Sequence, residues 1–145
     1  MQPTILIILI GLVGGVAVGL QSPMASMISQ RLGTWESIFI VHAGGTLLAL
    51  IPLLFLGGGK LAEWRSLPWY ALWAGIFGLV VIAAISYMIP RIGVAGSIIT
   101  VVAGQLFVGT ILDHFGWLGA VERPLDAPRL LGLGILMLGV WLTVK

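Results

Sequence analysis

The distribution of charge constrains this chain more than any other feature of its sequence. No Asp, Glu, Lys or Arg occurs before Arg31, and four further apolar stretches follow. A run of about 20 apolar residues is long enough to cross a hydrocarbon core about 30 Å thick. Charged residues make up 8% of the chain, whereas soluble domains carry about 25%. The sequence therefore predicts an integral membrane protein.

We expect an all-α membrane fold with five transmembrane helices that form a single domain over residues 1–145. Pro23 predicts a kink in the first helix, because proline lacks the N–H and crowds the preceding turn. Thr34 is the expected N-cap of the second helix, and 90–93 is the expected turn between the third and fourth. Asp126 and Pro128 are typical of a helix start. The expected spans cover about residues 4–32, 35–56, 69–89, 94–112 and 129–145.

An odd number of crossings places the two termini on opposite sides of the membrane. The positive-inside rule orients a membrane protein by an excess of Lys and Arg on its cytoplasmic side. Here the N-terminal side receives four basic residues and the other side three, out of seven in the chain. The first group is Lys60, Arg65, Arg123 and Arg129, and the second is Arg31, Arg91 and Lys145.

This near balance favours dual topology, in which the same chain inserts in both orientations. Two opposed copies would form an antiparallel dimer of ten helices, which is an inverted repeat. Inverted repeats underlie alternating access in many transporters. The alternative is a fixed orientation that folding or a partner imposes.

Small residues recur along one face of the first helix and allow close helix packing in lipid. The predicted packing glycines are Gly11, Gly15, Gly19, Gly45 and Gly104.

Two amides and several serines are the candidates for substrate binding. An amide in lipid must find hydrogen-bond partners or cost a few kcal/mol. Gln21 and Gln105 therefore either join helices or line a polar cavity. Ser22 and Ser26 follow Gln21 on the first helix, and Pro23 would free backbone groups beside such a site.

Four ionisable side chains are candidates for proton transfer or gating. His42 lies about two turns into the second span, and an imidazole changes charge between about pH 5 and 8. It either binds substrate and relays protons or hydrogen-bonds to a neighbouring helix. Glu36 lies in the first turn of that helix, where the dipole stabilises an anion. Asp113 and His114 end the fourth span, where they either anchor the following loop or form a gate.

Three segments and Gln21 carry a resemblance that extends over essentially the whole chain. The segments are GVAGS (93–97), GQLFVGTILDHFGWLG (104–119) and RLLGLGILMLGVWL (129–142). With the number of spans and the loop order, they resemble the short five-helix YdcZ-like branch of the drug/metabolite transporter superfamily. The resemblance implies a bacterial inner-membrane protein with a ten-helix functional unit. That unit would be an antiparallel homodimer, a pair of opposed paralogues or a fused chain.

The resemblance also carries over to individual residues. The family-like positions are Gln21, His42, Gly104, Gln105, Asp113 and His114. The chain departs from the pattern at Ala25, where relatives carry Asn four residues after the first-helix Gln. A site that uses this amide is therefore in doubt here.

The sequence argues against several other functions. There is no cysteine, the two histidines lie far apart, and no acidic cluster accompanies them, so no metal site is predicted. No cofactor is predicted, because the glycine-rich segment 11–19 lies inside a lipid-spanning helix and is not a phosphate-binding loop. The basic residues form no cluster for nucleic acid. An enzyme is not expected.

The expected function is secondary transport, with export of a small metabolite or amphipathic solute. Small multidrug-resistance proteins are similar in size and dual topology, but they use a buried glutamate in the first helix. This chain has none there, which favours a neutral or zwitterionic solute. Two alternatives stay open. The chain could be a non-transporting membrane assembly subunit, or a flippase for a lipid-linked metabolite.

Overall fold

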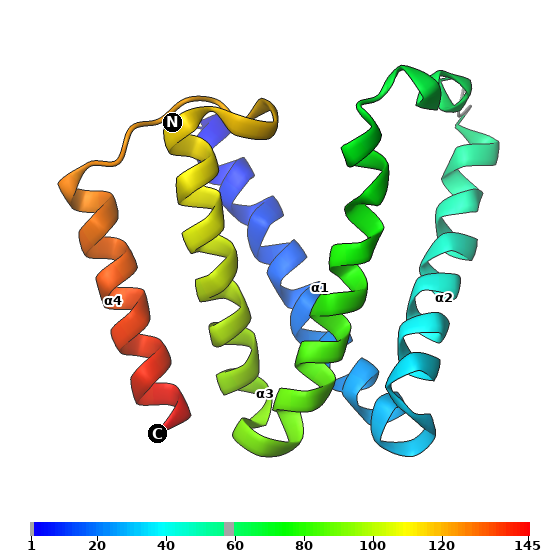
Figure 1. The fold of residues 1–145 in the computed structure, drawn as a ribbon, viewed down its shortest axis with the longest axis horizontal. Coiled ribbons are helices and arrows are strands. Elements are labelled where there is room, and N and C mark those ends of the chain that lie inside the picture. Colours follow the sequence, from blue (N-terminus) through cyan, green and yellow to red (C-terminus); the bar gives the residue numbers. More distant parts are fainter. Residues whose placement is uncertain (1, 57–59) are drawn as a thin grey trace. The chain divides into compact units, whose positions relative to one another are not determined.

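The computed structural model describes residues 2–56 and 60–145, and it contains no strand among them. The longer helices are α1 (Gln2–Leu32), α2 (Thr34–Phe55), α3 (Ala74–Phe115) and α4 (Ala127–Val144), as Figure 1 shows. Three short 3-10 helices lie between them: η1 (Leu61–Ser66), η2 (Trp69–Trp73) and η3 (Trp117–Gly119). The all-α fold class is confirmed for the described residues.

Four helical stretches are long and apolar enough to cross a membrane. They are Thr4–Leu32, Thr34–Phe55, Trp69–Phe115 and Ala127–Val144. The third has 47 residues, which at about 1.5 Å each would extend about 70 Å, more than twice a hydrocarbon core. The predicted third and fourth spans both lie within this stretch.

Helix α3 is interrupted at one glycine. Gly93 has φ 75° and ψ 173°, values that do not belong to a helix. A positive φ of this size is accessible to glycine at little cost. The helical segments are therefore 74–92 and 94–115. The expected turn over 90–93 is correct in its place, but the helix continues through Pro90 and breaks only at Gly93.

The chain divides into two compact units, Met1–Tyr87 and Met88–Lys145. The first contains α1, α2, η1, η2 and the start of α3. Its buried cluster joins three helices through Ala25, Ile38 and Ile82. Most of the long apolar side chains of α1 and α2 are exposed, as on a surface that contacts lipid or another chain.

A glycine corner joins α1 to α2. Gly33 is the N-cap of α2 and has φ 120° and ψ 158°. The prediction of Thr34 as N-cap was wrong, because the Thr34 hydroxyl instead lies 3.0 Å from the Ser29 hydroxyl of α1. A second contact fixes the corner: the Ser37 hydroxyl donates to the carbonyl of Ala25 over 2.7 Å.

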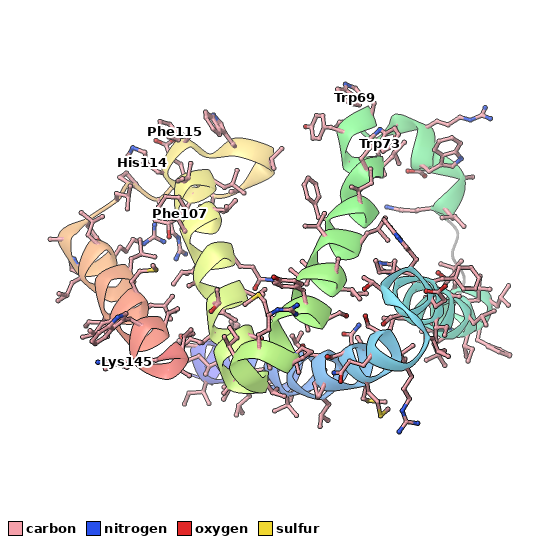
Figure 2. The ribbon with its side chains drawn as sticks, turned by 60° about the horizontal axis from the view of Figure 1, so that its bottom comes forward. Trp69, Trp73, Phe107, His114, Phe115 and Lys145 are labelled. Carbon is pink, nitrogen blue, oxygen red and sulfur yellow. The ribbon has the colours of Figure 1, made fainter. Side chains whose placement is uncertain are left out.

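Aromatic side chains surround the start of α3. Trp69 and Trp73 are the first and last residues of η2, the short helix that leads into α3 (Figure 2). The ring of Trp69 meets Tyr70 edge-on at 6.2 Å. Aromatic residues of this kind collect at membrane–water interfaces.

The second unit contains the rest of α3, η3 and α4. The predicted start of the last helix is confirmed, because the Asp126 carboxylate accepts a 2.9 Å hydrogen bond from the backbone N–H of Arg129. Helix α4 approaches the 94–115 segment at Gly139, where an added Cβ would lie 3.7 Å from the Ile99 side chain.

Candidate functional site

An open cavity of about 510 Å³ lies within the first unit. Three helices line it, α1 with one residue, α2 with five and α3 with three. Its surface is mostly apolar, with three polar side chains. The lining residues are Gln21, Val41, His42, Gly45, Thr46, Ala49, Gly78, Val81 and Ile82.

The imidazole of His42 has a defined orientation in this cavity. Its Nδ1 lies 2.8 Å from the carbonyl oxygen of Ile38, one turn earlier in α2. A carbonyl oxygen only accepts hydrogen bonds, so Nδ1 carries a hydrogen and donates it. The other ring nitrogen, Nε2, faces α3, because a Cβ added at Gly78 would lie 2.9 Å from it.

Thr46 lies one turn after His42 on the same side of α2. Its hydroxyl donates to the carbonyl oxygen of His42 over 2.8 Å. The hydroxyl hydrogen is therefore used within the helix, and the oxygen faces the cavity as an acceptor. Thr46 was not among the predicted site residues, although its spacing of four residues from His42 was a usable signal. No sequence pattern could have identified Gly78, because its contact with His42 depends on which helix packs against α2.

Gln21 supplies the remaining polar side chain of the cavity. It is exposed, and its amide has no hydrogen bond to any part of the chain that the structure describes. An unpaired amide within a membrane span is costly. Gln21 therefore needs a polar occupant of the cavity, water or a second chain.

The two candidate serines of α1 lie elsewhere. Ser22 is buried and donates to the carbonyl of Val18 over 2.7 Å. Ser26 is buried as well, and its hydroxyl accepts from the side-chain amide of Gln30 over 3.1 Å. The structure thus brings Gln21 and His42 to one cavity and does not bring these serines there. Ala25 is buried at the α1–α2 contact, where an amide would enter the packed cluster.

Glu36 lies in the first turn of α2, as expected. Its side chain packs against the α1–α2 corner, because a Cβ added at Gly33 would collide with the carboxylate. Glu36 is six residues before His42, or about 9 Å along the helix, and it does not line the same cavity. Among the described residues no group of His, Cys, Asp and Glu could hold a metal ion.

Asp113 and His114 belong to a polar cluster in the second unit. The Asp113 carboxylate pairs with the Arg129 guanidinium over 3.1 Å, and Arg129 also donates to the carbonyl of Arg123 over 2.9 Å. The backbone N–H of Arg123 donates to the carbonyl of Asp113 over 2.7 Å. His114 Nδ1 accepts from the backbone N–H of Leu125 over 3.1 Å. These contacts tie the loop before α4 to the end of α3, and we call them the loop clamp.

Aromatic rings extend this clamp. His114 and Phe115 lie side by side at the end of α3 (Figure 2), with ring centroids 4.6 Å apart. Phe115 stacks on Trp117 at 4.8 Å. Asp113 and His114 were predicted as candidates from the sequence, but their partners were not. Arg129, at the start of the next helix, has the opposite charge to Asp113, and this could have indicated the ion pair.

The remaining candidates show neither a hydrogen bond nor close packing in the part of the chain that the structure describes. Gln105 is exposed and has no hydrogen bond there. A Cβ added to any of the predicted packing glycines would meet no atom within 4 Å. Their packing role stays a prediction that needs a second chain. These glycines are Gly11, Gly15, Gly19, Gly45 and Gly104.

Comparison with known proteins identifies the family. Residues 6–142 match the family described as "Putative inner membrane exporter, YdcZ". None of the curated proteins and none of the solved structures matched. The match covers nearly the whole chain and agrees with the long apolar helices. This chain therefore belongs to the YdcZ family and is a multi-pass protein of the inner membrane.

Proposed function

We propose that the chain is a secondary transporter that exports a small solute by alternating access, as an antiparallel dimer. The observation that carries this proposal is the cavity in the first unit. It joins Gln21 of α1 to His42 of α2, two side chains that are expensive to leave unpaired in a membrane. An otherwise apolar cavity with a few polar groups is typical of a small-molecule site.

The proposal includes five membrane crossings. Segments 74–92 and 94–115 would extend roughly 28 and 33 Å at about 1.5 Å per residue, so each is long enough to cross alone. With α1, α2 and α4, this gives an odd number. The termini then lie on opposite sides, and the near balance of Lys and Arg supports insertion in both orientations.

A second, inverted copy would complete the transporter. The packing glycines and Gln105 have no partner in the described chain. Small residues allow close approach of helices in lipid, and a buried amide can bond across such an interface. An inverted pair would have the symmetry that lets a cavity open to each side in turn.

A non-transporting assembly subunit is the second candidate, and the unpacked glycine faces favour it. This candidate predicts that Gly15→Leu and Gly104→Leu abolish function while Gln21→Leu and Gln105→Leu preserve it. The transporter predicts loss of function for both amide variants as well.

Solute efflux from proteoliposomes tests the proposal. The vesicles contain a panel of radiolabelled neutral, zwitterionic, cationic and anionic metabolites. We expect saturable efflux of neutral or zwitterionic members, and stimulation when unlabelled solute is present outside. Efflux should fall about tenfold to a hundredfold in Gln21→Leu. Efflux equal to that of protein-free vesicles for every member of the panel would contradict the proposal.

A further inference from the structure

The hydrogen-bond pattern of the cavity depends on which polar atoms carry hydrogens. His42 donates from Nδ1 to the carbonyl of Ile38. A neutral imidazole carries one hydrogen, so Nε2 is left as an acceptor with a free lone pair. Among the described residues no Asp or Glu lines the cavity to balance an imidazolium, and an unpaired charge in the membrane is costly.

The other polar atoms add to this pattern. The Thr46 hydroxyl already donates to the His42 carbonyl, so its oxygen is a second acceptor. Among the described lining residues, Gln21 is the one whose side chain has free N–H groups, and it also has a carbonyl oxygen. The cavity thus presents two atoms that only accept, His42 Nε2 and the Thr46 oxygen, beside the Gln21 amide, and its described lining contains neither Lys nor Arg.

We propose that this cavity selects a neutral amphipathic solute that carries a hydroxyl group. The O–H donates to His42 Nε2, and the solute oxygen accepts from the Gln21 amide. The apolar part of the solute contacts Val81 and Ile82. An anion finds no cation in the cavity, and a permanent cation finds no carboxylate. This inference rests on the proposed function and names the class of solute for the same cavity.

Gly78 keeps the acceptor atom accessible. An added Cβ would lie 2.9 Å from Nε2 and 3.6 Å from the neighbouring ring carbon of His42. An alanine methyl group there would crowd Nε2 and narrow the approach of the solute donor, or would rotate the ring. Gly75, one turn earlier in α3, is a matched control, because an added Cβ there meets nothing within 4 Å.

Nitrogen NMR on protein with isotope-labelled histidine, in lipid nanodiscs, tests the inference directly. The chain has two histidines, and His42→Gln assigns their signals. Four probes share a benzyl or phenyl ring: benzyl alcohol, benzyl methyl ether, benzyltrimethylammonium and benzoate. We expect His42 Nε2 to be unprotonated and its resonance to shift saturably with benzyl alcohol. The ether should bind about tenfold more weakly, because one hydrogen bond is lost.

The variants sharpen this result. Gly78→Ala should weaken binding of the alcohol about tenfold and leave binding of the ether unchanged, while Gly75→Ala leaves both unchanged. Equal binding of alcohol and ether, tighter binding of either charged probe, or a protonated Nε2 without probe would overturn the inference.

Failure of the inference is distinguishable from failure of the proposed function. Selective binding of the alcohol without efflux of any solute from proteoliposomes would leave the cavity chemistry standing and remove the transport function. Efflux of a solute that lacks a hydroxyl, with no response at Nε2, would leave transport standing and remove the hydroxyl selectivity.

Discussion

The cavity of the first unit and the loop clamp of the second unit use their polar side chains in opposite ways. In the clamp, Asp113 and Arg129 pair with each other, and His114 accepts from a backbone N–H. In the cavity, Gln21 and the Nε2 atom of His42 have no partner in the described chain. Satisfied polar groups hold a structure together. Unsatisfied ones within a membrane span indicate where another molecule binds.

The largest expected effect is a loss of transport activity when the polar side chains of the cavity are replaced. Gln21→Leu and His42→Leu should each lower efflux about tenfold to a hundredfold, since each removes a buried hydrogen bond to the solute. Met24→Leu, at an exposed position of α1, is the control. Efflux from proteoliposomes measures the effect. Unchanged efflux in both cavity variants would remove the functional distinction between cavity and clamp.

The next effect concerns the corner that positions the cavity helices. Gly33→Ala should destabilise the protein by about 1–3 kcal/mol, because alanine is strained in this backbone conformation. The new methyl group would also displace the Glu36 carboxylate, which that flexible side chain allows at little further cost. Gly75→Ala, within α3 and without close neighbours, should cost nothing. Denaturation in detergent followed by circular dichroism gives both values, and equal stabilities would show that the corner is not strained.

A smaller effect is expected at the contact between α1 and α2. Ser37→Ala removes the buried hydrogen bond to the Ala25 carbonyl and should cost about 0.5–1.5 kcal/mol. Ser66→Ala removes an exposed hydrogen bond to Glu63 and should cost less. The same denaturation experiment compares them, and a larger loss at Ser66 would contradict the assignment of the core.

The smallest effect is expected in the clamp. Asp113→Asn should cost at most about 1 kcal/mol, because the ion pair is partly exposed to solvent. It should speed hydrogen exchange in the loop before α4 and leave efflux unchanged. Mass spectrometry after exchange measures the first and proteoliposomes the second. A loss of efflux greater than that of Gln21→Leu would instead make Asp113 part of a gate.

Local sequence signals predicted much of the fold. Hydropathy located the long apolar helices, and Asp126 identified the start of α4, because capping depends on residues two or three positions apart. Thr34 failed as a cap because a tertiary contact with Ser29 engages its hydroxyl. The turn predicted over 90–93 contains the break at Gly93, but the helix ends later than expected, since Pro90 is tolerated within a helix that continues to Ile92.

The candidate site was less predictable. Gln21 and His42 were found because polar side chains are conspicuous in apolar spans. Their meeting at one cavity, and the role of Gly78, depend on how three helices pack. The pairing of Asp113 with Arg129, 16 residues later, depends likewise on the path of the loop between them.

The central claim is that one chain inserts in both orientations and pairs with itself to form the transporter. The chain contains no cysteine, so a single cysteine at Ala62, an exposed position of η1, reports orientation without background. Intact cells are treated with a membrane-impermeant maleimide before and after permeabilisation. The account predicts that about half of the molecules react from outside and the rest only after permeabilisation. Labelling that is complete from one side, and absent from the other, would contradict it.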